Sequence, residues 1–386
     1  MPLSVLYVGS TDPNGTCSHR RAAMERLGLS VTPFDLEAET RGGGRIANVV
    51  RRRLQTGPVI ERANRAFLDR VTAGRYDLVW CDKALALRPA TIRAARETGA
   101  VTAQYICDNP FGRMGEPGWR HVVAALPDYD AWFVPRDSSL EDFARRGARR
   151  VELMPFAFEP TVNHPPPAGW SDADRTEDVT FIGSPYDNRP AVIRALIEKH
   201  GLSVALYGPR WERRLGAGAA AALGVRGPVW GDAYRETMWR SRICLSFVTH
   251  SNLDPYAHRS FEIAATRGFL MAERTEGHEA LFEEDREAVF FDGAEDLAAR
   301  IRRWLADPAG REAVAEAGWR RAMTSGYSND ERLAAAIGAL FPDLADTLAE
   351  RARATVAAIA ERHRPNGADD RHAEAPPLER RAGAGR

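Results

Sequence analysis

The chain has 386 residues, which is too long for one ordinary hydrophobic core and predicts two domains. Hydrophobic residues make up 44% of it, enough to fill two cores. Its 53 basic residues balance 53 acidic ones, which argues against nucleic acid or an anionic lipid surface as a partner.

The cysteines and the first residues bear on where the protein works. Four cysteines are scattered without any Cys-x-x-Cys pair, so neither a zinc site nor a disulfide framework is expected, and a reducing cytoplasm fits. The first apolar run, residues 3–9, lacks the basic flank of a signal peptide and is expected to be a strand. No apolar stretch approaches the roughly 20 residues that span a bilayer, so no transmembrane segment is expected.

In the first half, short apolar runs alternate with longer amphipathic segments, which is typical of parallel α/β layers. Strands are predicted at residues 3–9, 31–35, 78–82, 101–108, 131–135 and 151–156. Helices are predicted at residues 18–27, 45–73, 89–98, 119–126 and 138–146. Gly57-Pro58 is expected to break the second of these helices. Residues 1–160 therefore form one predicted Rossmann-like domain.

The second half repeats this organisation after a proline-rich linker at residues 161–176. Strands are predicted at residues 179–184, 204–208, 244–248, 269–273 and 288–291, within a second Rossmann-like domain at residues 177–325. Helices within residues 326–363 are expected to pack back on the first domain, and residues 364–386 to be disordered. Two such domains would hold a ligand in the cleft between them, at the carboxyl ends of their strands.

Residues 259–282 carry the strongest functional signal. Arg259 and Glu262 lie three residues apart on a predicted helix and therefore share one face. A glutamate placed there can accept two hydrogen bonds from the vicinal hydroxyl groups of a ribose. The alternative is a surface ion pair between the two side chains without a function.

The loop that follows predicts an anion site. Thr275 to Gly277 would present backbone N–H groups at the start of the next helix, and helix starts attract phosphates. His278, in the first turn of that helix, would add a side-chain donor. A structural role is the alternative for this histidine.

Two turns of the second half point to the same kind of ligand. Gly183 and Ser184 follow a strand, and Arg189 begins the next helix, so a phosphate could approach the backbone and pair with the arginine. Tyr207 and Arg210 follow another strand and are further candidates for contacts with the donor.

Taken together, these motifs resemble a known enzyme family. The order strand–Gly-Ser–Arg, Tyr-Gly-x-x-Trp, Arg-x-Phe-Glu-x-x-Ala-x-x-Gly and Glu-Ala-Leu-Phe is similar to that of the CgeB-like (spore maturation protein-like, glycosyl transferases group 1) branch of GT-B glycosyltransferases. The resemblance covers most of residues 180–327 and is looser in the first half. It implies two Rossmann-like domains facing a cleft, with a nucleotide diphosphate sugar on the second and the acceptor on the first.

The resemblance also implies a role for the acidic residues. Related retaining enzymes carry two glutamates separated by seven residues around this helix, and Glu262 matches the second, which binds ribose. Asp254 stands eight residues earlier, in a different local context. This departure leaves the sugar contacts and the anomeric outcome open.

The first domain offers three candidates for the group that activates the acceptor. They are, in order of preference, Asp108 at the end of a predicted strand, His19 at the start of a helix, and Asp12 in the first loop. Each could instead cap a helix or a turn.

No metal and no cofactor are expected. The Asp-x-Asp pairs Asp172/Asp174 and Asp128/Asp130 lie in the linker and before a strand, away from expected metal positions. The first loop lacks the Gly-x-Gly-x-x-Gly pattern of dinucleotide sites, which argues against a dehydrogenase.

The sequence thus predicts a metal-independent glycosyltransferase whose partners are a nucleotide-sugar donor and a small-molecule, glycan or protein acceptor. A nucleotide-sugar epimerase and a non-catalytic nucleotide-sugar-binding protein are the alternatives. Assembly into a homo-oligomer is left open.

Overall fold

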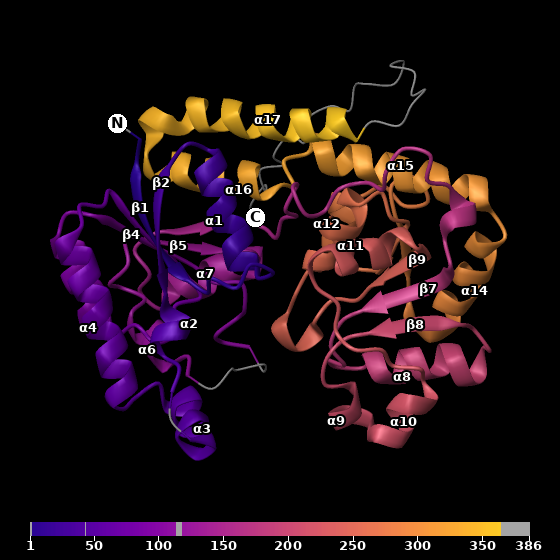
Figure 1. The fold of residues 1–386 in the computed structure, drawn as a ribbon, viewed down its shortest axis with the longest axis horizontal. Coiled ribbons are helices and arrows are strands. Elements are labelled where there is room, and N and C mark those ends of the chain that lie inside the picture. The colour runs from indigo at the N-terminus through magenta and orange to yellow at the C-terminus, as the bar shows by residue number, and fades with distance from the viewer. Residues whose placement is uncertain (1, 43, 113–117, 364–386) are drawn as a thin grey trace, which may run out of the picture.

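The computed structural model describes residues 2–42, 44–112 and 118–363. They form two lobes, each built around a parallel sheet with helices on both faces (Figure 1). The first sheet has the strand order β2-β1-β3-β4-β5-β6 and the second the order β11-β10-β9-β7-β8. Within the described residues, no helix is long and apolar enough to cross a membrane. The predicted disordered tail, residues 364–386, lies outside the described part of the chain.

The central strands of the first sheet are apolar and covered on both faces. Its strands are β1 (Ser4–Gly9), β2 (Ser30–Asp35), β3 (Leu78–Asp82), β4 (Val101–Tyr105), β5 (Ala131–Val134) and β6 (Val151–Leu153). Every residue of β3 is buried, as expected for a central strand covered on both sides. Two strands end three residues earlier than predicted, since β4 ends at Tyr105 and β6 at Leu153.

Helices cover both faces of this sheet. They are α1 (Thr16–Arg26), α2 (Leu36–Glu39), α3 (Arg45–Leu54), α4 (Pro58–Ala73), α5 (Pro89–Glu97), α6 (Arg120–Ala124) and α7 (Asp137–Arg145). The predicted break between α3 and α4 is confirmed. Gly57 has a φ of 105°, which favours glycine, and Pro58 occupies the first helical position, where its missing N–H is not needed.

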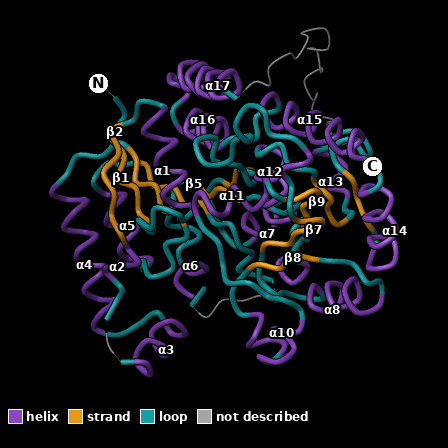
Figure 2. The backbone as a smooth tube through the Cα atoms, turned by 45° about the vertical axis from the view of Figure 1, so that its right-hand side comes forward, coloured by secondary structure: helices purple, strands orange, loops and turns teal. Residues whose placement is uncertain are grey.

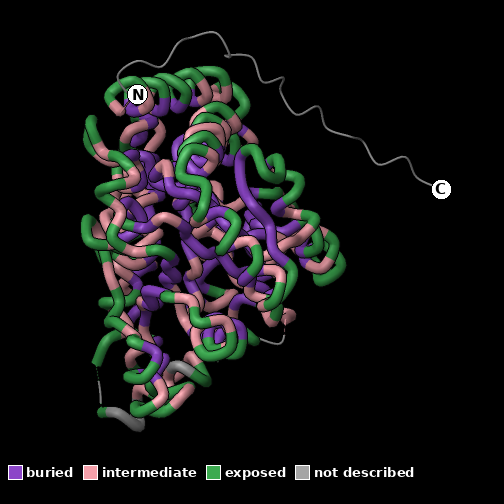
Figure 3. The backbone as a smooth tube through the Cα atoms, turned by 90° about the vertical axis from the view of Figure 1, so that its right-hand side faces the viewer, coloured by how far each residue is buried: buried purple, intermediate pink, exposed green. Residues whose placement is uncertain are grey.

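The second sheet contains β7 (Glu177–Ile182), β8 (Val204–Tyr207), β9 (Ser241–Ser246), β10 (Leu270–Glu273) and β11 (Val289–Phe291). Its helices are α8 (Arg189–Arg194), α9 (Trp211–Leu215), α10 (Ala217–Ala222), α11 (Gly231–Trp239), α12 (His258–Ala265), α13 (Glu276–Leu281), α14 (Gly293–Leu305) and α15 (Pro308–Thr324). A π-helical turn, Ala195–Lys199, continues α8. Buried residues lie inside and exposed ones on the outer surfaces (Figure 3).

The last two helices return to the first lobe. In α16 (Asn329–Leu340), Leu333 and Ile337 are fully buried in the same apolar cluster as Val5 and Tyr7 of β1. Helix α17 (Ala345–Arg362) contacts α1, α16 and α15, and runs across the top of the molecule (Figure 1 and Figure 2). The carboxyl-terminal segment therefore ties the two lobes together.

The chain crosses between the lobes twice, and the crossings lie side by side. Phe158 donates its N–H to the carbonyl of Tyr327 over 3.1 Å and accepts from the N–H of Asn329 over 2.9 Å. Next to this pairing, Arg26 of α1 contacts Glu159 at 2.8 Å and Asp330 at 2.6 Å. The side chains of Glu159 and Asp330 are 1% and 0% exposed, so Arg26 is a cation shared by two buried carboxylates where the chain crosses between the lobes.

Replacing Arg26 by methionine is expected to lower the free energy of unfolding by about 3–5 kcal/mol, because it leaves two carboxylates buried without a cation. Urea denaturation measures the change. The matched control is Arg21→Met on the same helix, which removes a more exposed i,i+4 pair with Glu25 and should change stability by less than about 1 kcal/mol. Equal losses in the two variants would contradict the structural role given to Arg26.

Candidate functional site

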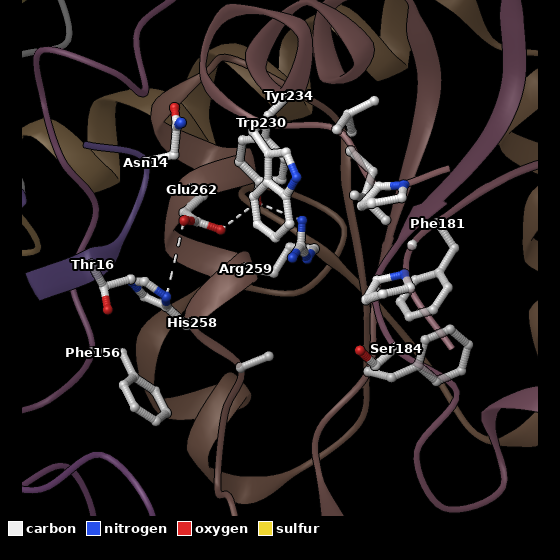
Figure 4. A pocket seen from close by; sticks show the side chains of 18 of the residues that line it. Asn14, Thr16, Phe156, Phe181, Ser184, Trp230, Tyr234, His258, Arg259 and Glu262 are labelled. Atoms are coloured by element: carbon white, nitrogen blue, oxygen red, sulfur yellow. Dashed lines mark hydrogen bonds and ion pairs between the residues drawn. The ribbon is translucent and has the colours of Figure 1, made fainter. Parts of the chain in front are cut away.

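A cleft of about 500 Å³ lies between the lobes, at the carboxyl ends of β7, β8 and β9. This volume falls within the usual range for a small-ligand site. The second lobe supplies most of the lining (Figure 4). The first lobe contributes the loop after β1 and the start of α1, through Pro13, Asn14, Thr16 and His19.

The structure brings most of the predicted donor-binding residues together in this cleft. The lining includes Gly183, Ser184, Arg189, Arg210, Arg259 and Glu262. It does not include Tyr207, Thr275, Gly277 or His278. The loops that follow β7 and β8 and the helix α12 are therefore the elements that build the second-lobe side of the site.

Glu262 is the carboxylate at the centre of the cleft wall. It lies one turn into α12, and its side chain is 12% exposed. The hydroxyl of Tyr234 donates to Oε2, and Nδ1 of His258 lies 3.9 Å from Oε1 (Figure 4). Burial raises the pKa of Glu262, but His258, Arg259 and the hydrogen bond from Tyr234 outweigh it and hold the pKa below its ordinary value. Glu262 is therefore ionised at neutral pH and can accept hydrogen bonds.

Arg259 and Glu262 do not form the direct surface ion pair that was the alternative reading of this segment. Tyr234 of α11 lies between them and accepts a hydrogen bond from Nη1 of Arg259 while donating to Glu262. Burial raises the pKa of Tyr234 well above its usual value, so the phenol keeps the proton that it donates. Sequence reasoning missed this role of Tyr234, because no spacing rule links residues on two separate helices.

Three arginines line the cleft, namely Arg189, Arg210 and Arg259. Arg189 donates to the carbonyls of Ser184 and Val248 and to Oγ1 of Thr249, at the ends of β7 and β9. Arg210 donates to the hydroxyl of Tyr186 over 2.8 Å.

In the part of the chain that the structure describes, none of Arg189, Arg210 and Arg259 forms a salt bridge. Burial lowers the pKa of Arg189 and the nearby Arg259 lowers it further, while Asp187 and Glu273 oppose the shift. Two guanidinium groups held near each other favour the binding of an anion between them.

The floor of the cleft is made of closely packed backbone. Gly208 has a φ of 146°, and a Cβ atom there would lie 2.0 Å from the carbonyl oxygen of Gly183. A residue other than glycine would therefore force the turns after β7 and β8 apart. Trp211 is buried below them and donates Nε1–H to the carbonyl of Gly183 over 2.9 Å, so it supports the floor.

The predicted anion site at the start of α13 is not part of the cleft. Thr275 caps the helix and donates to the carbonyl of Pro255 over 2.6 Å, and a Cβ at Gly277 would lie 2.3 Å from the same carbonyl oxygen. These residues hold the loop before α12 in place. The remaining donor candidate outside the cleft, Tyr207, bonds through its hydroxyl to Arg226.

His278 is fully buried and has a structural role in place of the predicted phosphate contact. Its Nδ1 lies 2.7 Å from the carbonyl oxygen of Glu273, which can only accept, so Nδ1 carries the proton. Nε2 then accepts from the N–H of Ala257 and from the hydroxyl of Ser260. Burial lowers the pKa of His278 to about 4, and the neutral ring fixes the start of α12.

Of the three candidates for acceptor activation, only His19 lines the cleft. Asp108 lies beyond the end of β4 because the strand stops at Tyr105, and it forms a 2.6 Å ion pair with Lys83. Asp12 accepts from the N–H of Asn14 and stabilises its own loop. Burial lowers the pKa of His19 from its ordinary value, although Glu159 and Glu262 oppose the shift. The ring is therefore neutral at pH 7.

The two Asp-x-Asp pairs have structural partners. Asp172 forms an ion pair with Arg311, and Asp174 accepts a hydrogen bond from the hydroxyl of Ser171. Asp128 forms an ion pair with Arg93, and Asp130 accepts a hydrogen bond from the hydroxyl of Thr102. Among the described residues, no three His, Cys, Asp or Glu side chains gather in a group that could hold a metal ion.

Comparisons with known proteins agree with this geometry. Residues 189–338 match a family model described as glycosyl transferase-like. No curated protein matches the sequence.

Solved structures similar to this chain include HepE from Anabaena in complex with UDP and glucose. The two share 16% identity, with 88% of this chain and all of HepE covered at a TM-score of 0.61. Sucrose-phosphate synthase from Thermosynechococcus elongatus shares 16% identity over 89% of this chain and 99% of its own, at 0.60. Trehalose 6-phosphate synthase from Burkholderia multivorans shares 16% identity over 93% and 100%, at 0.57. The predicted GT-B fold is thereby confirmed.

The buried His278 predicts a pH-dependent stability. In the folded protein the pKa of His278 is about 4, below the ordinary 6.5. As the pH falls from 6.5 to 4, the unfolded chain therefore binds a proton on His278 before the folded protein does. The free energy of unfolding decreases over this pH range. Between pH 7 and 4.5 the wild type should lose about 2 kcal/mol more than His278→Asn, which cannot titrate there. Urea denaturation at the two pH values measures the difference. An identical pH dependence in both proteins would disprove this role.

Proposed function

We propose that the protein is a glycosyltransferase that moves a sugar from a nucleotide diphosphate sugar to a small-molecule, glycan or protein acceptor. The observation that carries this proposal is the ionised, largely buried Glu262 beside Arg189, Arg210 and Arg259, which have no acidic partner of their own in the described residues. A diol-binding carboxylate next to clustered cations fits a ligand with a pentose and a diphosphate. The crystallised complexes of HepE with UDP and with UDP-glucose support the same ligand class.

We assign the parts of the donor to residues of the second lobe. Glu262 binds the vicinal hydroxyls of the ribose, and Arg189 and Arg259 offset the charge of the diphosphate in place of a metal ion. Gly183 and Ser184 let the phosphates approach the backbone after β7. Trp230 lines the cleft with 61% of its surface exposed, so its ring can stack on the base. Within GT-B enzymes, the motifs of residues 180–327 favour the CgeB-like branch.

The first lobe receives the acceptor in this proposal. Of the described first-lobe residues that line the cleft, His19 alone has a titratable side chain near neutral pH. Its ring is neutral at pH 7 and makes no hydrogen bond within the described residues, so it can take the proton of an acceptor hydroxyl. The two lobes enclose the reacting groups, which limits the access of water and favours transfer over hydrolysis.

The donor assignment predicts selective stabilisation by one nucleoside diphosphate among UDP, GDP, TDP and ADP. At about 100 times its dissociation constant, the right ligand should add about 2.7 kcal/mol of apparent stability, measured as a thermal shift. Glu262→Ala should lose most of this shift because the ribose loses its charged acceptor. The exposed Glu236→Ala, which breaks only an i,i+4 pair with Arg240, serves as control and should keep it. A full shift in Glu262→Ala would refute the assignment.

The role of His19 predicts a pH profile. Donor turnover, followed as release of nucleoside diphosphate with water as acceptor, should fall on the acid side with an apparent pKa below 6.5, because burial lowers the pKa of this base. His19→Ala should reduce the rate about 10²–10⁴-fold and abolish the acid limb. His121→Ala provides the control, since His121 lies in the same lobe but outside the cleft lining. An unchanged acid limb in His19→Ala would exclude this role.

A further inference from the structure

Helix α3 departs from the balanced charge of the chain as a whole. Four of its 10 residues are arginine and none is acidic. Along the sequence, the nearest acidic residues on either side are Glu39 and Glu61. Arg51 donates to uncharged oxygens of its own helix and of the preceding loop, and neither it nor Arg53 forms a salt bridge with a residue that the structure describes. The helix therefore carries an excess of positive charge.

The same helix exposes apolar side chains beside these cations. Val49 is 58% exposed and Leu54 is 47% exposed. No other helix within the described residues exposes two large hydrophobic side chains. Val49 and Arg53 are four residues apart and share one face of the helix, and Leu54 follows directly. A surface helix normally buries its apolar residues against its own domain, so α3 has an apolar surface without a partner in the lobe that carries it.

The position of α3 suits contact with an extended surface. It lies at the end of the first lobe away from α17, and α9 and α10 of the second lobe lie at the same end of the molecule (Figure 1 and Figure 2). Helix α9 contains one glutamate, Glu212, and two arginines, Arg213 and Arg214, all of them exposed. Both lobes therefore expose arginine at this end.

We propose that α3 binds the surface of an anionic phospholipid bilayer. Arg51 and Arg53 contact lipid phosphates, and Val49 and Leu54 enter the boundary between the headgroups and the acyl chains. A nucleic acid would also attract the arginines, but it would gain little from an exposed valine and leucine, so the combination favours a bilayer. Binding of this kind is peripheral and needs no membrane-spanning helix.

This inference goes beyond the proposed function and does not depend on it, because no described residue of α3 lines the cleft. The equal numbers of acidic and basic residues in the chain are no argument against it. Attraction to a charged surface falls off within about 10 Å at ordinary salt, so the charge that counts is the charge of the segment that touches the lipid.

Sedimentation of the full chain with vesicles tests the inference. The wild type should bind vesicles of phosphatidylcholine with about 30% phosphatidylglycerol at least about tenfold more tightly than vesicles of phosphatidylcholine alone, because only the former carry net negative charge. Raising the salt concentration from about 0.1 M to about 0.5 M should weaken this binding, since salt screens the attraction.

The cationic part of the contact is tested by the double variant Arg51→Gln with Arg53→Gln. Its affinity for the anionic vesicles should fall more than about tenfold, because each arginine near such a surface contributes about fivefold. The matched control is Arg145→Gln with Arg146→Gln, which removes two arginines of α7 that already pair with acidic residues of their own helix. The control should bind as the wild type does.

The apolar part is tested by Val49→Ser with Leu54→Ser, which should lower the affinity for the anionic vesicles about tenfold. Its control is Val123→Ser with Leu153→Ser, because these two side chains of the same lobe are 36% and 40% exposed and lie outside α3. This control should not change the affinity.

Three results would overturn the inference. The first is a wild type that does not bind anionic vesicles or binds neutral ones equally well. The second is an equal loss in the variants and their controls, which would place the contact elsewhere. The third is full binding by Val49→Ser with Leu54→Ser, which would indicate a general attraction to polyanions such as RNA. All four variants should keep the thermal shift with the nucleoside diphosphate, so the outcome is separate from that of the proposed function.

Discussion

The site depends on keeping Glu262 ionised although its side chain is largely buried. Burial of a carboxylate without partners favours its neutral form, and a neutral Glu262 would be a poor acceptor for two hydroxyls. The structure meets this requirement with a hydrogen bond from Tyr234 and with His258 and Arg259 nearby, which lower the pKa of Glu262. Tyr234 links Glu262 to Arg259, so the carboxylate and the guanidinium group of the site belong to one hydrogen-bonded group.

The rigidity of α12 follows from the same requirement. Glu262 can hold its position only if the first turn of the helix is fixed, and the buried, neutral His278 provides this through Ala257 and Ser260. Gly277 and Thr275 support the preceding loop by direct contact with Pro255. Thr275, Gly277 and His278, which the sequence suggested as a phosphate site, thus hold in place the helix that carries Glu262. Both interpretations explain why glycine, threonine and histidine occur together, and only the tertiary contacts distinguish them.

The fold was more predictable from the sequence than the site. Buried strands are continuous apolar runs, and helix-breaking signals such as Gly57-Pro58 act locally, so most elements could be placed within a few residues. Helical spacing also placed Arg259 and Glu262 on one face. Asp108 was misplaced because the apolar run continues beyond Tyr105, where pairing with β5 ends and the chain turns toward the second lobe.

The contacts that sequence reasoning could not supply join distant segments. Tyr234 and Glu262 are 28 residues apart, and Arg136 and Asp254 are 118 residues apart and belong to different lobes. No periodicity relates such pairs, since their proximity follows from the way the sheets and lobes pack. The balanced total charge likewise concealed the local excess of arginine in the cleft.

In the proposed function, this distribution of charge gives the two lobes different tasks. The second lobe carries arginines that form no salt bridge within the described residues. This suits the nucleoside diphosphate, which is highly charged after the sugar leaves. The first lobe faces the cleft with the neutral His19, two uncharged polar side chains, and the apolar Pro13 and Phe156. A proposed acceptor hydroxyl would therefore meet a base without a competing ionic partner. Arg136 of the first lobe is charged, and it forms an ion pair with Asp254 of the second lobe. This ion pair, the hydrogen bond from Tyr256 to Pro135 and the one from Asn109 to Asn252 together fix the position of the first lobe relative to the loop before α12.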